Sequence, residues 1–577
     1  MTAKPLLAAA SALALLLGAC ASTTGEGGAA PGAQAQSAWS DFLNRSIEGY
    51  FRLNPEFAVN QGRHEYDGQL PDWSGTGLAN SVSFLRSTIA GAERFDPAQL
   101  TEAQRFERDY LIAVMRGQLF WLTVADSPRR NPAFYVGSLD PSVYVTRPYA
   151  PPEQRMRAYI AYLRHVPRAA EQIRANLRTP LPASFIDYGK AGFGGFAEYY
   201  GGDGKAAFAG VQNPALQAEL NQASDAAARA TRRLADWLEA QRPNATQDFA
   251  LGAERFAQML RDTEMVDTPL AELERVGRED LQRNQQALRD ACARYAPGAT
   301  IPACMERMNA NKAEGGAVAG ARAQLAGLRR FIEQQDLVSI PGTEEAQVEE
   351  APPYNRQNFA YISIPGPYER GLPSVYYIAP PDPAWPREVQ EGFVPGEADL
   401  LFTSIHEVWP GHFLNFLHAN RSPFLFGRVF VGYAFAEGWA HYTEEMMWEA
   451  GLGRGDLETH IGQISNALLR DCRYLSAIGM HTGRMTMEQS RQMFRDQCFQ
   501  DEGNARQQAA RGTYDPAYLN YTMGKLMIRR LREDWTRTRG GRRAWKQFHD
   551  RFLSYGGPPI PLVRQQMMRE AAPRAVF

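Results

Sequence analysis

Apolar residues recur at three- and four-residue spacing along most of this chain, which is the pattern of a helix that buries one face. Alanine, leucine, arginine, glutamate and glutamine dominate these stretches, and all five have high helix propensity. Proline and glycine gather between the stretches and mark their ends. The stretches span 153–178, 212–241, 268–295, 315–335, 455–479 and 516–537. The sequence therefore predicts a mainly α, multi-helix fold.

Two short segments interrupt this helical pattern. Residues 359–364 and 374–378 are rich in aromatic and β-branched side chains, which favour strands. We therefore expect a small β element just upstream of residue 406. An exposed strand edge there could hold an extended peptide by main-chain hydrogen bonds, although a hairpin that only packs fits the pattern equally well.

The N-terminus has the features of an export signal. The apolar run 6–17 is too short to span a bilayer and follows a positive charge. Leu17-Gly18-Ala19-Cys20 resembles a bacterial lipobox, in which cleavage leaves the cysteine to carry lipid. An ordinary secretory signal cleaved nearby is the alternative. We expect residues 1–20 to be a lipoprotein signal peptide and the small, polar residues 21–37 to be a flexible tether.

Lipidation of Cys20 would anchor the protein in the bacterial cell envelope, on the periplasmic face, with the outer membrane as the expected location. The chain carries 62 lysine and arginine residues against 64 aspartate and glutamate residues, a net charge of −2. No surplus of positive charge is available to neutralise a row of phosphates, which argues against nucleic acid as a partner. We expect a peptide substrate, and membrane contact only through the lipid.

Four further cysteines remain, and an exported chain can form disulfides. Four cysteines allow three pairings, of which the short loops favour Cys292 with Cys304 and Cys472 with Cys498. Four buried free thiols are the alternative. No Cys-x-x-Cys occurs, so a zinc site built from thiolates is not expected.

Histidine is concentrated in one part of the chain. Six of the nine histidines lie between residues 406 and 481, at positions 406, 412, 418, 441, 460 and 481. The segment HEVWPGH (406–412) is followed by EGWAH (437–441). Together they offer imidazole and carboxylate ligands, plus one further carboxylate to take a proton from metal-bound water. We predict a divalent metal site with Zn²⁺ as its metal, and packing or surface roles for His418 and His460.

The spacing of His406 and His412 poses a geometric problem. On a regular helix, residues six apart point roughly 120° away from each other and cannot face one metal. Pro410 removes the amide that would bond the His406 carbonyl, and Gly411 tolerates unusual backbone angles. We expect the helix to open here by an extra half-turn, which would swing His412 back toward His406.

A second helix over residues 434–447 is expected to supply the other groups. Glu437, His441 and Glu444 are spaced so that they share one helical face. Glu437 is the expected third ligand. Glu444 is expected to orient a ligand histidine through its free ring nitrogen, and His441 to lie behind the ligands or to face the substrate.

These motifs resemble those of the bacterial family known as domain of unknown function 885, which is grouped with the gluzincin zinc peptidases. The family pattern His-Glu-x-x-Pro-Gly-His, then Glu-Gly-Trp-Ala-x-Tyr-x-Glu, matches residues 406–412 and 437–444 position by position. Phe413 departs from it, because relatives often have a second histidine there, and His441 stands where they often have an aliphatic residue. Weaker similarities cover residues 55–58, 62–67, 479–483 and 521–525.

The resemblance covers nearly all of the mature chain. It implies a gluzincin-like helical fold, zinc held by His406, His412 and Glu437, and Glu407 as the general base. Residues 38–577 would form this zinc-peptidase-like domain, optionally divided into an N-terminal helical subdomain (38–340) and a metal-site subdomain (341–577).

The expected function is therefore that of an envelope-anchored zinc metallopeptidase that hydrolyses peptide bonds of oligopeptides. His481 and Tyr521 are candidate donors to the oxyanion, and Arg473 is a candidate for holding a substrate carboxylate. Ordinary helix packing or surface pairing is the alternative for each of these three residues. A zinc amidase acting on cell-wall peptides and a non-enzymatic envelope lipoprotein are the alternative functions.

Overall fold

Helices form almost all of the computed structural model, which describes residues 31–352, 355–356 and 359–577. All six stretches with helical spacing are helical, so the predicted mainly α fold is confirmed. The long helices are α1 (Pro31–Leu53), α3 (Gly75–Glu93), α4 (Glu102–Leu119), α8 (Pro152–Asn176), α9 (Ala183–Gly201), α11 (Pro214–Glu239), α12 (Ala253–Glu264), α13 (Leu270–Tyr295), α15 (Ala317–Gln334), α17 (Glu397–Glu407), α20 (Tyr433–Glu449), α21 (Leu457–His481), α22 (Met487–Gln497), α23 (Glu502–Tyr514) and α24 (Asn520–Thr536).

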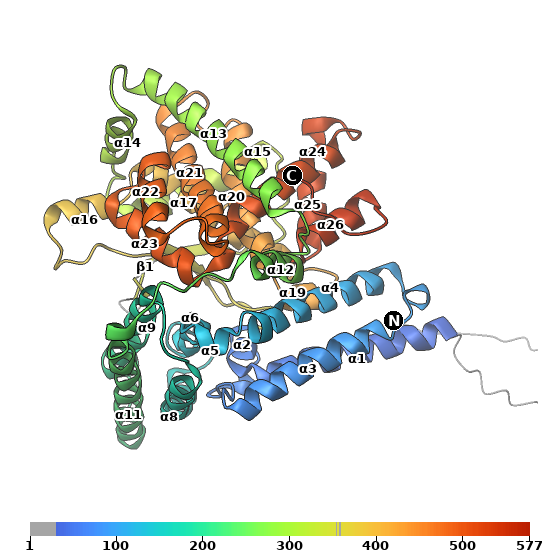
Figure 1. The fold of residues 1–577 in the computed structure, drawn as a ribbon, viewed down its shortest axis with the longest axis vertical. Coiled ribbons are helices and arrows are strands. Elements are labelled where there is room, and N and C mark those ends of the chain that lie inside the picture. Colours follow the sequence, from blue (N-terminus) through green and yellow to red (C-terminus); the bar gives the residue numbers. More distant parts are fainter. Residues whose placement is uncertain (1–30, 353–354, 357–358) are drawn as a thin grey trace, which may run out of the picture.

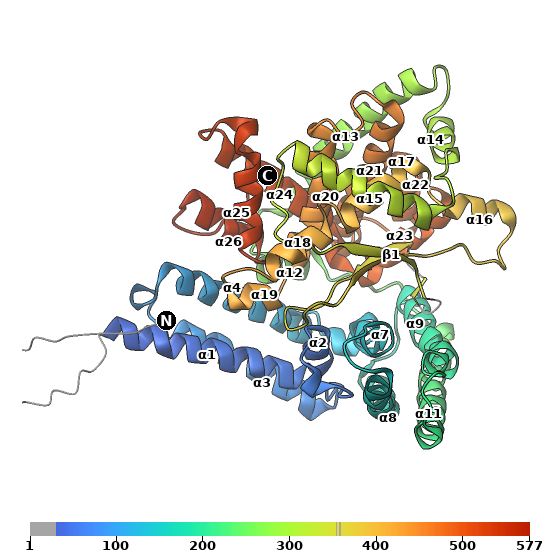
Figure 2. The same cartoon turned by 180° about the vertical axis from the view of Figure 1, so that it is seen from behind.

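Shorter helices connect them or cover their ends. They are α2 (Pro55–Asn60), α5 (Ser127–Arg130), α6 (Ala133–Val136), α7 (Ser142–Thr146), α10 (Asp203–Ala206), α14 (Ile301–Ala310), α16 (Arg387–Phe393), α18 (His412–Ala419), α19 (Leu425–Val429), α25 (Trp545–Ser554) and α26 (Ile560–Met568). Helices α1, α3 and α4 lie side by side along one edge of the molecule, and α8, α9 and α11 form a group next to them (Figures 1 and 2). The remaining long helices form the main body, with α17, α20 and α21 near its centre.

One small sheet lies between the main body and the N-terminal helices (Figure 2). Its strand order is β1 (Ala346–Glu350), β3 (Ser374–Ile378), β2 (Ala360–Ser363), with β1 parallel and β2 antiparallel to β3. The sequence predicted β2 and β3. It gave no signal for β1, because only Val348 of that strand is buried and its neighbours are mostly polar. Strand β2 is an edge strand and lies against α17.

One expectation about chain organisation needs correction. Residues 31–37, part of the expected tether, begin helix α1, because their alanine and glutamine residues are compatible with a helix once α1 packs on the core. Buried apolar residues on both sides of residue 340, the optional subdomain boundary, belong to one core. One core extends from Trp39 to Met567 and includes Leu281 of α13 and Leu468 of α21. Smaller apolar clusters of their own lie around α8, α9 and α11 instead.

The candidate lipidation residue Cys20, the signal peptide 1–20 and residues 21–30 of the tether lie outside the described residues. Within the described part of the chain, none of the helices combines the length and the apolar content that crossing a bilayer requires.

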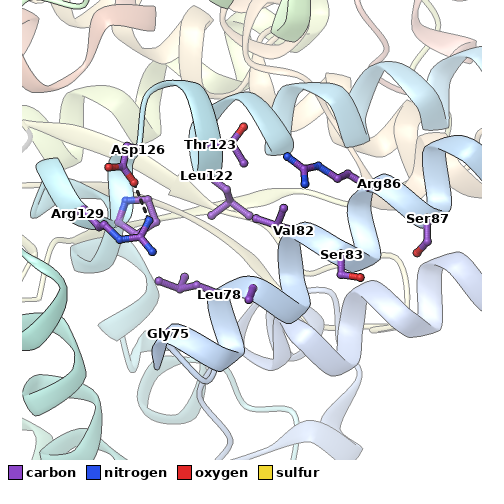
Figure 3. Close-up of a pocket in the computed structure, with 12 residues that line it drawn as sticks. Gly75, Leu78, Val82, Ser83, Arg86, Ser87, Leu122, Thr123, Asp126 and Arg129 are labelled. Atoms are coloured by element: carbon purple, nitrogen blue, oxygen red, sulfur yellow. Dashed lines mark hydrogen bonds and ion pairs between the residues drawn. The ribbon is translucent and has the colours of Figure 1, made fainter.

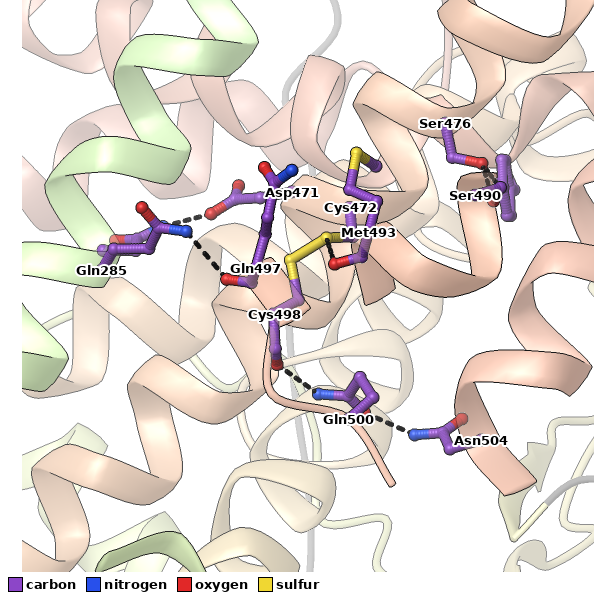
Figure 4. Close-up of a disulfide and its surroundings, with 12 residues drawn as sticks. Gln285, Asp471, Cys472, Ser476, Ser490, Met493, Gln497, Cys498, Gln500 and Asn504 are labelled. Atoms are coloured by element: carbon purple, nitrogen blue, oxygen red, sulfur yellow. Dashed lines mark hydrogen bonds between the residues drawn. A yellow bond between two sulfur atoms is a disulfide. The ribbon is translucent and has the colours of Figure 1, made fainter. Parts of the chain in front are cut away.

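Two disulfides have the pairing that the short loops favour. Cys292 bonds to Cys304, and Cys472 bonds to Cys498. The second of these joins the middle of α21 to the end of α22, next to a hydrogen bond from Gln285 of α13 to the Gln497 carbonyl (Figure 4). It thereby fixes the start of α23 relative to α21, and both helices carry residues of the site described below.

Candidate metal centre

The Pro-Gly break separates two helices instead of widening one. Helix α17 ends at Glu407, and α18 begins at His412. The expectation of an extra half-turn within one helix is therefore wrong, because Pro410 has no amide to continue the bonding of α17 and the chain turns sharply there. A side-chain carbon on Gly411 would lie 1.8 Å from the His406 carbonyl oxygen, so only glycine fits this turn.

The two sequence motifs hold each other in place. Trp439 of α20 donates an indole hydrogen bond of 2.8 Å to the Pro410 carbonyl, which binds the turn to the second helix. Gly438 of α20 lies against Gly524 of α24, where an added side-chain carbon would come within 2.5 Å of the Gly524 Cα. These glycines let the two helices approach closely, and so they set Tyr521 of α24 beside Glu437.

The three predicted metal ligands lie close together where α17, α18 and α20 meet. The Glu437 carboxylate oxygen Oε2 lies 3.2 Å from His406 Nε2 and 3.3 Å from His412 Nε2. The three ligand atoms all lie within 4.8 Å of one another. We call these three residues the triad.

The triad fits a zinc ion in both chemistry and size. Two imidazoles and one carboxylate leave a fourth position open for water or substrate, as in catalytic zinc sites. Ligand atoms around a tetrahedral zinc with bonds of about 2.0–2.1 Å lie roughly 3.3 Å apart. Two edges of the triad already have this length. The third needs a side-chain shift of at most about 1.5 Å, given the 4.8 Å limit.

A fully buried carboxylate lies behind the triad. Glu444 accepts a hydrogen bond of 2.7 Å from His406 Nδ1, which leaves Nε2 of that ring free to bind a metal. Glu444 also lies 3.2 Å from His441 Nδ1 and 3.7 Å from Arg470 Nη2. His441 is itself completely buried, so it lies behind the ligands and does not face the substrate. Burial lowers the pKa of His441 to about 4, which keeps it neutral.

The charges of the triad balance one another without a metal. Burial opposes a charge on His406, yet hydrogen bonds to Glu437 and Glu444 raise its pKa to about 9. Burial likewise opposes ionisation of Glu437, but the neighbouring histidines hold its pKa well below the ordinary value. A metal that binds His406 would displace the proton that these hydrogen bonds favour on its ring.

Glu407 is a carboxylate without a hydrogen-bond partner among the described residues. It is the last residue of α17 and only 9% exposed, and none of the described residues donates a hydrogen bond to it. Burial raises the pKa of Glu407, while the adjacent His412 and His406 oppose the rise. A free, desolvated carboxylate beside three ligands has the character expected of a general base.

Tyr521 and Arg473 also belong to this site. The Tyr521 hydroxyl donates a hydrogen bond of 2.9 Å to Glu437 Oε1. The guanidinium of Arg473 lies over the Tyr521 ring, 4.8 Å from its centroid. Tyr521 therefore contacts a predicted ligand directly, and Arg473 contacts Tyr521.

His481 lies elsewhere, and its predicted role in holding the oxyanion is corrected. Its Nε2 donates to the Gly512 carbonyl at 2.7 Å, and its Nδ1 accepts from the Leu251 amide at 3.4 Å. Eight residues of α21, about 12 Å of helix, separate it from Arg473. Burial lowers its pKa to about 4, so it is a neutral histidine that joins three chain segments.

The other two histidines of the region have packing roles. His418 lies 2.8 Å from the Ser339 carbonyl through Nε2, and His460 stacks on Trp448 with ring centroids 4.1 Å apart. Neither of them belongs to the triad.

Three residues of the site carried no sequence prediction. Arg470 contacts Glu444, and its spacing of three from Arg473 on one helix was an available signal. Arg511 and Tyr433 lie against Tyr521, from α23 and the start of α20. Only the tertiary fold brings those two together, so no local pattern could have identified them.

A buried charge network fixes α20 from its other side. Lys525 is fully buried and donates to Asp280 of α13 at 2.6 Å. It also lies 3.4 Å from Glu445, the residue after Glu444. The positive charges of Lys525 and Arg283 hold the pKa of Glu445 well below its ordinary value, against the effect of burial. Helices α13, α20 and α24 are thus joined next to the helix face that carries Glu444 of the candidate site.

A separate hollow of about 850 Å³ lies among the N-terminal helices, between α3 and the turn after α4 (Figure 3). Its walls are Gly75, Leu78, Ala79, Val82, Ser83, Arg86, Ser87, Leu122, Thr123, Asp126, Pro128 and Arg129. Asp126 and Arg129 form an ion pair there, and no triad residue lines it. The ionisable groups of the chain converge at the triad and not in this hollow, which makes the triad the candidate site.

A family model described as bacterial protein of unknown function (DUF885) matches residues 55–567. The chain belongs to this family. None of the curated proteins matches it. The match spans both motifs of the metal centre, so the family assignment expected from those motifs is confirmed.

Two solved structures share the fold over almost their entire length. One, from Shewanella oneidensis, is described as a candidate lipoprotein of unknown function; it is 24% identical, with a TM-score of 0.75 over 92% of this chain and 99% of its own. The other, from Colwellia psychrerythraea, is also described as a candidate lipoprotein; it is 16% identical, with a TM-score of 0.76 over 93% and 99%. These similarities show the fold of this chain.

Proposed function

We propose that this protein is a zinc-dependent peptidase of the bacterial cell envelope, with the gluzincin type of active site. One observation carries the proposal. The triad offers a three-ligand zinc site, and the unpaired carboxylate of Glu407 lies directly beside it. A purely structural zinc site has four protein ligands and needs no such base.

Zinc held by His406, His412 and Glu437 would supply a Lewis acid that polarises a carbonyl and acidifies water. Glu407 takes the proton from the attacking water and passes it to the leaving amine. The Tyr521 hydroxyl, freed from Glu437 Oε1 by a small rotation, donates to the developing oxyanion. Glu444 keeps the His406 ring in the orientation that ligation needs.

The small sheet offers a place for an extended substrate. Among the described strands β2 pairs only with β3, and it lies against α17, the helix that carries His406 and Glu407. A peptide added to the other edge of β2 would form main-chain hydrogen bonds independent of its side chains. This supports oligopeptides as the substrate class.

Three observations support an envelope location with a lipid anchor at Cys20. The N-terminal segment has the order of charge, apolar run and cysteine that a lipoprotein signal requires. Both structural neighbours are described as candidate lipoproteins. The two disulfides also suit an exported protein.

Digestion of a peptide library by the purified protein tests the proposed activity. We expect cleavage that stops when a chelator removes the metal and returns when zinc is added. Purified muropeptides form the second arm of the experiment. Cleavage of muropeptides alone would replace the proposal with a cell-wall amidase, and no cleavage by fully zinc-loaded protein would contradict enzymatic function.

A further inference from the structure

Arg473 is a buried cation without an acidic partner. It lies in α21, is 7% exposed, and donates one hydrogen bond, from Nε to the Gln508 side-chain oxygen at 2.8 Å. No carboxylate of the described residues lies within ion-pair distance of it. Its two terminal nitrogens form no hydrogen bond with these residues. They are also not among the fully buried atoms that lack a partner, so solvent can reach them.

A neighbouring arginine, by contrast, has an acidic partner. Arg511 of α23 donates from Nε to Asp515 at 3.1 Å and from Nη2 to the Tyr433 hydroxyl at 3.1 Å. Arg473 has no counterpart of Asp515. Burial and the positive charge of Arg511 lower the pKa of Arg473 to about 10. An unpaired buried guanidinium is unfavourable, and an incoming carboxylate would remove that penalty.

The position of Arg473 relative to the triad decides what it can hold. The Tyr521 ring lies between them, with its hydroxyl on Glu437 and its face 4.8 Å from the Arg473 guanidinium. Arg511 lies 5.9 Å from the same ring. One tyrosine ring and one hydrogen bond thus lie between the Arg473 guanidinium and the ligand Glu437, so a carboxylate held by Arg473 would lie next to the triad and outside it.

We propose that Arg473, with Arg511 beside it, binds the terminal α-carboxylate of a peptide, so that this enzyme removes residues from the C-terminus. The inference rests on the proposed peptidase activity and adds its substrate class. The oxygen of water bonds to the carbonyl carbon of the last peptide bond, and the C–N bond breaks. The water proton travels through Glu407 to the departing amine of the terminal residue.

Ordinary stacking of Arg473 on Tyr521 is the simpler explanation, and it accounts for the cation–π contact. It does not account for the terminal N–H groups of the guanidinium, which lie near the triad and have no hydrogen-bond partner among the described residues. The planar guanidinium presents paired N–H groups that match the two oxygens of a carboxylate.

Three peptides of one sequence test the inference: one with a free C-terminus, one amidated, and one amidated with glutamate as its last residue. Zinc-loaded wild-type protein is expected to cleave the free peptide about 10- to 100-fold better in kcat/KM than the plain amide, the range for a charge-assisted contact. Arg473→Ala should bring this ratio close to one, mainly through a higher KM for the free peptide. Arg473→Lys should restore only part of it.

Binding provides a readout that does not depend on turnover. In the Glu407→Gln background, calorimetry should show tighter binding of the free peptide than of the amide, and Arg473→Ala should remove the difference. Arg532→Ala is the matched control. Arg532 is equally buried, at 5% exposure, but lies 11 residues beyond Tyr521 in α24, about 16 Å along the helix, and pairs with Glu449. The Arg532→Ala variant should retain the wild-type ratio of kcat/KM between the free and the amidated peptide.

Each contrary outcome has a separate meaning. Equal cleavage of free and amidated peptides by the wild-type protein would overturn this inference and leave the peptidase proposal standing. Equal preference for the glutamate-ended amide would assign Arg473 to a side-chain carboxylate instead. No cleavage of any peptide by zinc-loaded protein would contradict the proposed function itself. If Arg473→Ala fails to fold, Arg473→Lys and Gln508→Ala, which removes the hydrogen bond to Nε, still test the ratio.

Discussion

Replacing Glu407 with glutamine is expected to lower kcat/KM on peptides by about 10²- to 10⁴-fold, the usual contribution of a general base, while the protein keeps its zinc. Glutamine has nearly the same shape but cannot accept the proton from water. Glu407 is not one of the three convergent ligands, so metal binding does not depend on its charge. Peptide hydrolysis and metal content, measured on the same sample, check both halves of this prediction.

Glu264→Gln is the matched control for this substitution. Glu264 is also buried, at 4% exposure, and burial raises its pKa to about 8. It is therefore uncharged at neutral pH, where an amide is a close mimic, and its partners are the Ala434 amide and Asn520. Activity in Glu407→Gln equal to that of this control would remove Glu407 from the proton transfer.

Replacing His412 with alanine is expected to abolish both zinc binding and hydrolysis. The substitution removes one of three ligands at the position that the Pro-Gly turn brings to the triad. Loss of an outer partner of a metal ligand weakens binding by about 10- to 100-fold, and loss of a ligand itself should exceed this. Competition with a chelator of known affinity measures the change.

His418→Ala provides the comparison. It lies six residues further along the same short helix and bonds to the Ser339 carbonyl instead of the triad. It should retain the wild-type zinc affinity and activity. Equal zinc affinity in His412→Ala and His418→Ala would mean that the turn does not deliver His412 to a metal.

The sequence was sufficient for the parts of the site that local chemistry determines. Glu437 and Glu444 follow from helical spacing, and both contact His406 of α17. The proline and glycine of the break identified the place where the chain departs from helical geometry. They did not show that α17 ends there, because that depends on contacts such as the Trp439 hydrogen bond to Pro410.

Long-range packing explains the failures. His481 matched a family segment, but its ring reaches the Gly512 carbonyl, on a helix that comes near only in the folded chain. Strand β1 forms because β3 offers it an edge, and its own residues have little strand preference. The packing of α13 on α21, on either side of residue 340, is likewise a long-range contact that no local composition reveals.

The central claim is that His406, His412 and Glu437 bind a single zinc ion across the Pro-Gly turn. X-ray diffraction from crystals of zinc-loaded protein, recorded on both sides of the zinc absorption edge, tests it most directly. The account predicts one anomalous peak about 2.0–2.2 Å from His406 Nε2, His412 Nε2 and a Glu437 carboxylate oxygen. Zinc bound at other residues, with no peak between these three, would contradict it.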